Sequence, residues 1–192
     1  VNAGTWSYED TRTLLEGDYT YQVRVVDAAG NIGQSDDQIV SVDLTGPSVS
    51  TLLNITSIST DSGTSSTDFI TNDQSITVNG VVGTLAADEQ VQISVDGINW
   101  VNLIVTGGTW SYQDPRVLSP DGDYTYQVRI VDIAGNIGAT DSQLIQIDTT
   151  APTQNAFINN YIDMVNPNIG FMGDNTETND TTPTLIGSVS AG

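Results

Sequence analysis

The sequence predicts an all-β chain of tandem β-sandwich repeats, each about 105 residues long, and three observations lead to this prediction. The stretch YTYQVRVVDAAGNIG at residues 19–33 recurs at residues 124–138 with two of its fifteen letters changed. Along much of the chain, apolar and polar residues alternate in twos, as in half-buried strands, and no segment shows helical periodicity. Clusters of Gly, Asn, Asp and Pro separate the alternating runs, as turns between strands do.

The repetition also predicts where the domains begin and end. Residues 4–47 align with residues 108–152 around one inserted residue near Ser119, with 28 identities in 44 positions. Both copies end in a similar string, VDLTGP at 42–47 and IDTTAP at 147–152, in which Pro favours a short, stiff link. We therefore expect residues 1–46 to be the C-terminal half of one repeat, residues 47–150 a complete repeat, and residues 151–192 the N-terminal half of the next.

Within the complete repeat, the pattern indicates about seven short strands, which is typical of an immunoglobulin-like β-sandwich. We expect strands at residues 75–81, 91–97, 100–106, 109–113, 124–132 and 143–148. Turns are expected at Asp96-Gly97 and Gly135-Asn136. Alternation puts Tyr124, Tyr126, Val128 and Ile130 on the core face of one strand. Tyr124, like Tyr19 in the earlier copy, stands where a tyrosine corner would fix the edge of the sandwich.

The charge of the chain narrows its chemistry. There are 24 acidic and four basic residues, with no His and no Cys, for a net charge of −20. The excess of negative charge argues against nucleic acid and anionic membranes as partners. No apolar run reaches a membrane-spanning length, so we expect no membrane insertion. Without His or Cys the usual zinc and copper sites and His-dependent catalytic triads are excluded. Oxygen ligands remain, and these suit Ca²⁺.

The usual order of strands in a sandwich places the acids at its two poles. The pole where the chain leaves the repeat, here called the C-terminal pole, should gather Asp61, Asp68, Asp73, Asp121, Asp123 and the linker residue Asp148. The pole where the chain enters, the N-terminal pole, should gather Asp132, Asn136 and the preceding linker residue Asp43. For Asp132 and Asn136, and for Asp27 and Asn31 in the earlier copy, hydrogen bonding within a turn is as good an explanation as ligation. Asp121 and Asp123 are also explained as solvated turn residues.

Several strings in combination resemble one known family: DSGTSSTDFITND, VQISVDGINW, GTWSYQD, DGDYTYQVRIVDIAGNIG and IDTTAP. They are similar to the bacterial Ig-like repeats of very large surface adhesins exported by type I secretion, and residues 153–188 are similar to a sister subtype. The resemblance implies an extracellular extender rod at the bacterial cell surface, stiffened by calcium between neighbouring repeats, which are its partners. Adhesion or biofilm formation would then use a ligand bound by other domains. By matching position, the resemblance implicates Asp43, Asp61, Asp68, Asp73, Asp148, Asp163, Asp174 and Asp180 as calcium ligands.

Two other functions remain as alternatives. A carbohydrate-binding accessory module of a secreted polysaccharide-active enzyme would need exposed, coplanar aromatic side chains. Trp110 and Tyr112 share one face of a strand, but alternation favours a core position for that face. A glycosidase could work with two carboxylates alone, yet acids concentrated in turns beside linkers are a poor indication of a catalytic pair. We therefore expect the protein not to be an enzyme.

Overall fold

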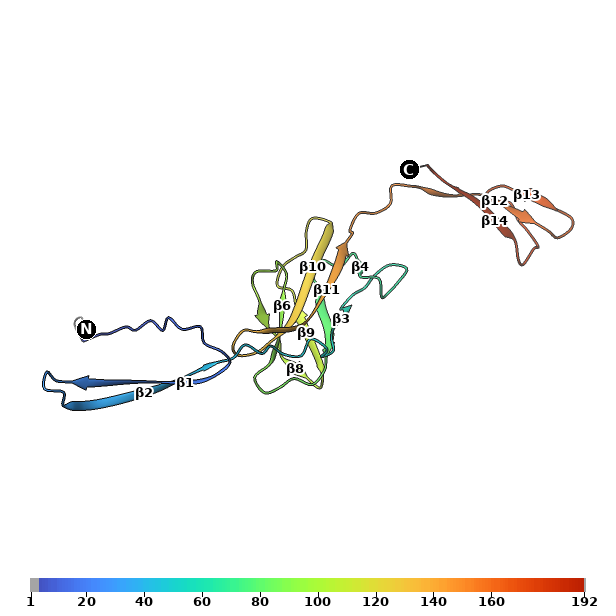
Figure 1. The fold of residues 1–192 in the computed structure, drawn as a ribbon. Helices are drawn as coiled ribbons and strands as arrows, with labels where there is room; N and C mark the ends of the chain where they lie inside the picture. Colours follow the sequence, from blue (N-terminus) through green and yellow to red (C-terminus); the bar gives the residue numbers. More distant parts are fainter. Residues whose placement is uncertain (1–3, 192) are drawn as a thin grey trace. The chain divides into compact units, whose positions relative to one another are not determined.

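The computed structural model describes residues 4–191, and they form strands, turns and loops without a helix (Figure 1). The chain divides into two compact units, Val1–Thr149 and Thr150–Gly192. The first unit contains a β-hairpin followed by a two-sheet sandwich, and the second contains one three-stranded sheet. The expected all-β class is thus confirmed, and the described residues include no helix long and apolar enough to cross a membrane.

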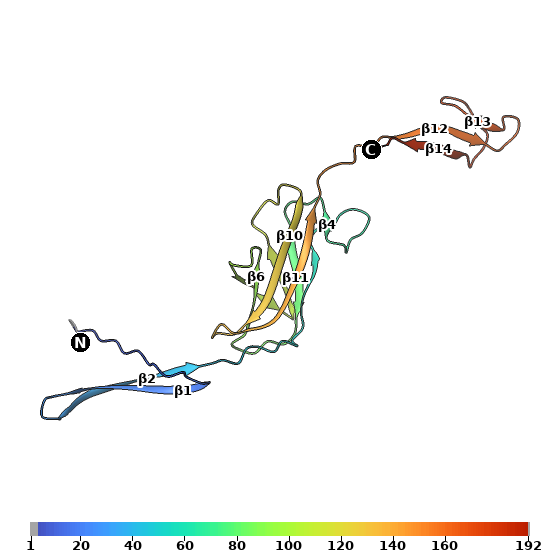
Figure 2. The same ribbon diagram turned by 45° about the horizontal axis from the view of Figure 1, so that its top comes forward.

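The sandwich of the first unit has a five-stranded and a four-stranded sheet. The five-stranded sheet has the order β4-β11-β10-β6-β7, with β4 at Ile70–Thr71, β11 at Ile137–Ile147, β10 at Gly122–Val131, β6 at Gln90–Ser94 and β7 at Val101–Asn102. The four-stranded sheet has the order β3-β5-β9-β8, with β3 at Leu53–Ile58, β5 at Thr77–Val82, β9 at Thr109–Gln113 and β8 at Val105–Thr106. Figure 2 shows β10 and β11, which are antiparallel neighbours, running side by side along the sandwich.

The core lies between these sheets, where the alternation of the sequence places it. Tyr126, Val128 and Ile130 of β10 are all at most 1% exposed, and Gln127, the outward residue between two of them, is exposed. Trp110 of β9 is 3% exposed, and Tyr112 packs against the same core. The core position expected for this aromatic pair is confirmed, and the pair therefore offers no exposed platform for a sugar.

Two tyrosines hydrogen-bond the backbone four residues upstream, as a tyrosine corner does. The Tyr124 hydroxyl donates to the carbonyl oxygen of Pro120 at 2.8 Å, and the Tyr19 hydroxyl donates to that of Leu15 at 3.0 Å. Both expected corners are confirmed. They fix the start of equivalent strands in the two copies of the repeat.

The apolar run at residues 100–106 does not form one strand as expected. Its start, β7, pairs with β6 in one sheet, and its end, β8, pairs with β9 in the other. Between them, the Leu103 amide donates to the Val91 carbonyl at 2.9 Å, so the chain crosses between the sheets. The strands β3 and β4 were not among the six expected; β3 carries a bulge between Ile55 and Ser57 that interrupts its alternation.

The hairpin preceding the sandwich comprises β1 at Gly17–Val26 and β2 at Ile32–Val42. Its register repeats that of β10 and β11, including a shift between Arg24 and Val26 that corresponds to the shift between Arg129 and Val131. The apolar residues of the hairpin, however, are exposed. Val25 is 70% exposed, whereas its equivalent Ile130 is fully buried. The hairpin therefore has the structure of half a sandwich without the sheet that would cover it.

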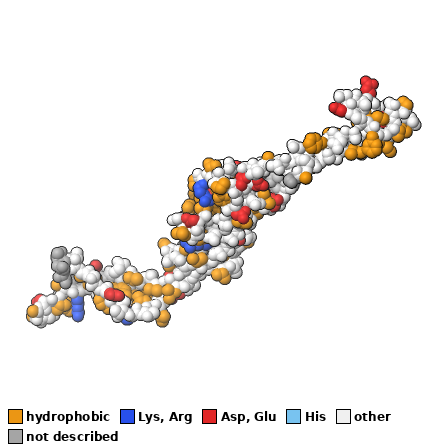
Figure 3. Space-filling model, turned by 90° about the horizontal axis from the view of Figure 1, so that it is seen from above, with side chains coloured by type: hydrophobic (Ala, Val, Ile, Leu, Met, Phe, Trp, Pro, Cys, Tyr) orange, Lys and Arg blue, Asp and Glu red, His pale blue; other side chains and the backbone are white. Residues whose placement is uncertain are grey.

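The second unit has the strand order β13-β12-β14, with β12 at Ala156–Asp163, β13 at Gly170–Met172 and β14 at Thr184–Val189. Phe157, Phe171 and Leu185 are each more than half exposed because only one sheet is present. Figure 3 shows hydrophobic side chains on the surface of this sheet and of the hairpin, and few basic ones anywhere on the visible face.

Candidate functional site

The departing linker of the sandwich lies against the long loop at residues 59–74, at the C-terminal pole. The Asp148 amide donates to the Thr71 carbonyl at 2.9 Å, and the Thr149 hydroxyl donates to Asp121 Oδ1 at 2.6 Å. A hollow of about 230 Å³ is lined by Ser62, Gly63, Ile70, Thr71, Asn72 and Asp148. The structure therefore brings together the linker, the long loop and the turn at residues 119–123, as the sequence predicts.

Asp61 is the most informative acid of this pole. Its Oδ2 accepts the Phe69 amide at 3.0 Å, which closes the loop. Its Oδ1 is buried from solvent and has no hydrogen-bond partner. Buried polar atoms are normally paired, because an unpaired one loses its interaction with water and gains nothing in return. An unpaired carboxylate oxygen next to Ser62 of the hollow is suited to a cation.

Two other acids predicted for the C-terminal pole, Asp68 and Asp73, accept backbone amides two residues ahead. Asp68 Oδ1 accepts the Ile70 amide at 3.2 Å, and Asp73 Oδ1 accepts the Ser75 amide at 2.9 Å. Asp123 is exposed and lies in β10, opposite Gln146 of β11. These three residues do not line the hollow, so a role for them as ligands stays a prediction.

The N-terminal pole joins the preceding linker to the turn between β10 and β11. Asn136 Nδ2 donates to the Asp43 carbonyl at 3.1 Å and to Asp132 Oδ2 at 2.9 Å, while the Asn136 amide donates to Asp132 Oδ1 at 2.8 Å. Burial raises the pKa of Asp132, but the hydrogen bonds from Asn136 outweigh it and the net pKa lies below its ordinary value. The Asp43 carboxylate accepts the Thr45 amide at 3.0 Å. The linker and the turn meet as predicted.

Asp27 and Asn31 repeat this turn in the hairpin. Asp27 accepts the Asn31 side chain at 2.7 Å and the amides of Asn31 and Ala29 at 2.8 and 2.9 Å. The hydrogen bond from the Asn31 side chain is the largest of the causes that hold the pKa of Asp27 below its ordinary value. In both copies the Asp and Asn form the turn predicted as the alternative to ligation, and both carboxylate oxygens already have donors.

In the second unit, two of the predicted acids are buried together. Asp163 is fully buried and Asp180 is 7% exposed. Thr178 connects them, because its hydroxyl donates to Asp163 Oδ2 at 2.6 Å and accepts the Asp180 amide at 2.9 Å. Asp174 is exposed and accepts the amide of the next residue, Asn175, at 3.0 Å. Asp174 is therefore not part of this network.

The residues of the C-terminal pole fit a calcium ion better than those of the other places. Calcium accepts carboxylate, hydroxyl and backbone carbonyl oxygens in flexible geometry. From the lining of the hollow, Asp148 would supply a carboxylate, and Ser62, Thr71 and Asn72 would supply neutral oxygens. Asp61 does not line the hollow, but it precedes Ser62 and would supply its unpaired oxygen. Within residues 4–191, no group of three or more acidic side chains is close enough to hold a metal by itself. Neutral oxygens and water must therefore complete any such site.

Sequence reasoning missed a buried ion pair that contacts the core residue Tyr126. Asp114, 2% exposed, accepts Arg116 Nη2 at 2.6 Å and the Tyr126 hydroxyl at 2.5 Å. Burial raises the pKa of Asp114, but the hydrogen bonds from Arg116 and then Tyr126 lower it further, and the net pKa lies below its ordinary value. The same contacts join Asp10 to Arg12 and Tyr21 in the hairpin. The recurring Asp-x-Arg spacing was the available signal.

Among the described residues, neither Arg24 nor Arg129 forms an ion pair with a carboxylate. The ion pairs within residues 4–191 are Arg12 with Asp10 and Arg116 with Asp114. Arg129 Nε donates to Gln92 Oε1 at 2.9 Å, and its guanidinium lies 3.9 Å from the centre of the Trp100 ring. Arg129 therefore contributes to the stability of the outer face of the five-stranded sheet through a cation–π contact.

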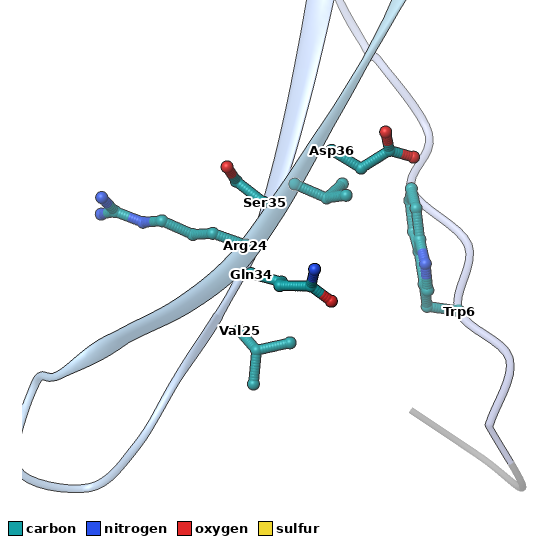
Figure 4. A pocket seen from close by; sticks show the side chains of 7 residues that line it. Trp6, Arg24, Val25, Gln34, Ser35 and Asp36 are labelled. Atoms are coloured by element: carbon teal, nitrogen blue, oxygen red, sulfur yellow. The ribbon is translucent and has the colours of Figure 1, made fainter.

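A hollow of about 700 Å³ lies on the hairpin and is lined by Trp6, Val23, Arg24, Val25, Gln34, Ser35 and Asp36. Figure 4 shows Trp6 facing the strands across it. The equivalents of Trp6, Val23 and Val25 in the sandwich are Trp110, Val128 and Ile130, which form the core. This hollow is thus the uncovered core face of half a sandwich, although Gln34 and Asp36 also lie on the side that faces Trp6.

Comparison with known protein families agrees with this fold. The family model described as "Bacterial Ig-like domain" matches residues 1–44 and 48–149. A solved structure described as a "tetra-tandem repeat in extending region of large adhesion protein" is 18% identical, with a TM-score of 0.33. The alignment covers 92% of this chain and 46% of that one, so the chain spans less than half the length of this neighbour. A search of curated proteins gave no match. The matched ranges make up most of the chain, which therefore belongs to the bacterial Ig-like domain family.

Proposed function

We propose that the chain is a non-enzymatic extender segment of a large bacterial surface adhesin, and that calcium stiffens it outside the cell. Family membership and the repetition of one sandwich sequence support a mechanical role, because repetition adds length without adding chemistry. A strand of about ten residues spans roughly 33 Å, so many such repeats in series would hold a distal binding domain far from the cell.

The observation that carries the calcium proposal is the buried, unpaired Oδ1 of Asp61, the residue before Ser62, which lines the hollow together with the linker residue Asp148. Calcium bound there would be held by Asp61 and Asp148, with oxygens of Ser62, Thr71 and Asn72. The ion would supply a positive charge between the loop and the linker and so hold the linker against its own sandwich. The hydrogen bond from Asn136 to the Asp43 carbonyl ties the preceding linker to the turn between β10 and β11.

The affinity expected for such a site would make its occupancy depend on whether the protein is inside or outside the cell. Extracellular modules bind calcium with Kd on the order of 10⁻⁴ to 10⁻³ M, so millimolar calcium outside the cell fills the site and cytosolic calcium leaves it empty. At ten times Kd, one site adds about 1.4 kcal/mol to the free energy of unfolding. The protein would remain loose before export and stiffen afterwards.

The experiment is a thermal melt of the chain in calcium and in chelator, combined with small-angle scattering under both conditions. We expect a higher midpoint and a narrower distribution of solution lengths in calcium. The Asp61→Asn variant should lose most of the increase, and the Asp174→Asn variant, changed at an exposed acid outside the hollow, should keep it. Unchanged midpoints and lengths in the wild type would refute calcium stiffening.

A further inference from the structure

The N-terminal half of the complete repeat and the half-repeat that follows it share a Thr-Asn-Asp motif. The motif forms the same turn in both. At residues 71–73 the Asp73 amide donates to Thr71 Oγ1 at 3.0 Å, and at residues 178–180 the Asp180 amide donates to Thr178 Oγ1 at 2.9 Å. In each turn the Asp Oδ1 accepts the amide two residues later, at 2.9 Å from Ser75 and 2.8 Å from Thr182. The motif thus places an equivalent threonine hydroxyl in both loops.

These two hydroxyls donate to different acceptors. Thr71 Oγ1 donates to the Thr60 carbonyl at 2.7 Å, whereas Thr178 Oγ1 donates to Asp163 Oδ2 at 2.6 Å. Asp163 is the last residue of β12, and Asp61 lies three residues after β3, next to the Thr60 carbonyl that accepts from Thr71. Asp61 has an oxygen without a donor, and Asp163 does not.

The network of the second unit is complete at every carboxylate oxygen. Asp163 Oδ1 accepts the Val165 amide at 2.8 Å, and Asp180 Oδ2 accepts the Met164 amide at 2.9 Å. Together with the bonds from Thr178 and Thr182, these give all four oxygens a donor. A cation would have to displace donors from buried groups, which would then be left unpaired.

We infer that the Asp163–Thr178–Asp180 network takes the place of a cation in the second subtype, and that calcium acts on the loop of the complete repeat alone. This inference rests on the proposed function and refines it. In a chain that combines both subtypes, the order of subtypes would then determine which loops respond to calcium.

The test is hydrogen–deuterium exchange of the whole chain in calcium and in chelator, read separately for two regions. At calcium ten times above Kd, exchange in peptides covering residues 59–75 and 146–150 should slow by about tenfold. Exchange in peptides covering residues 161–182 should be the same in both conditions. If both regions slow, this inference is overturned and the proposed function stands. If neither slows, or if residues 161–182 alone respond, the proposed function fails.

A variant tests the atomic cause. Thr178→Val removes the donor to Asp163 Oδ2, so residues 161–182 should become responsive to calcium. Thr176→Val is the matched control, because Thr176 donates to the Gly173 carbonyl in the same loop and not to either buried acid. Thr178→Ser keeps the hydroxyl and should behave as the wild type, which shows whether any effect of valine comes from the lost donor. A Thr178→Val chain that stays folded in chelator and still ignores calcium would overturn the inference.

Discussion

Gly80 of β5 lies directly under the indole ring of Trp110 in β9. A Cβ atom at residue 80 would overlap the ring and the backbone oxygen of Asn54 on the neighbouring strand β3. The indole Nε1 donates to the Val81 carbonyl at 3.3 Å, so the ring cannot move away without losing that bond. A residue without a side chain is therefore required where the largest core side chain crosses the sheet.

We predict that Gly80→Ala lowers the free energy of unfolding of the sandwich by about 1–3 kcal/mol or more, because the added methyl overpacks the core. Urea unfolding followed by tryptophan fluorescence measures this change. Gly173→Ala is the control, since a Cβ there meets no atom within 4 Å. Equal stabilities for the two variants would show that Trp110 can relocate.

We predict that Asp114→Asn costs about 3–5 kcal/mol, the range for breaking a buried ion pair, because Arg116 and the Tyr126 hydroxyl lose a charged acceptor. The Asp114 side chain is fully buried, whereas the Arg116 side chain is 41% exposed. Because Arg116 can regain hydrogen bonds to water, we expect a cost near the lower end of that range. Chemical denaturation of the chain gives the value. Asp10→Asn, the same change in the hairpin, should leave the sandwich transition unchanged. A negligible cost for Asp114→Asn would contradict the role given to the pair.

The low pKa of Asp114 predicts a specific dependence on pH. Its ordinary pKa is 3.8, and in the folded state hydrogen bonds from Arg116 and Tyr126 outweigh burial and lower it. A carboxyl whose pKa is lower when folded adds stability above pH 3.8 and loses it as the pH falls through the folded value. Urea unfolding at pH 5 and at pH 3 should therefore show a larger loss for the wild type than for Asp114→Asn. Equal losses would exclude this group as a source of acid sensitivity.

The stack of Arg129 on Trp100 predicts a difference between arginine and lysine. Arg129→Lys keeps the charge but loses the planar stack and the geometry of the bond to Gln92, so we expect a loss of about 0.5–1 kcal/mol. Arg24→Lys is the matched control, at the same position of the hairpin. Urea unfolding of the sandwich measures the effect of both variants. No loss of stability for Arg129→Lys would mean that the stack adds nothing beyond charge.

The parts of this structure that the sequence could predict are those set by local pattern. Alternation places Tyr126 and Val128 in the core, and Gly135 and Asn136 form a turn by their own conformational preferences. The switch of residues 100–106 between sheets depends on Leu103 meeting Val91, and no local residue marks it. The unpaired oxygen of Asp61 likewise depends on the hydrogen bonds within its loop, where the Thr71 hydroxyl donates to the Thr60 carbonyl. Composition does not reveal these bonds.

Equilibrium dialysis of the purified wild-type chain and of the Asp61→Asn variant against calcium tests directly whether the loop with Asp61 binds a calcium ion. We expect the wild type to bind calcium with Kd on the order of 10⁻⁴ to 10⁻³ M and the variant to bind one ion fewer per chain. A wild-type chain that binds no calcium at millimolar concentrations, or a variant that binds as much as the wild type, would contradict this expectation.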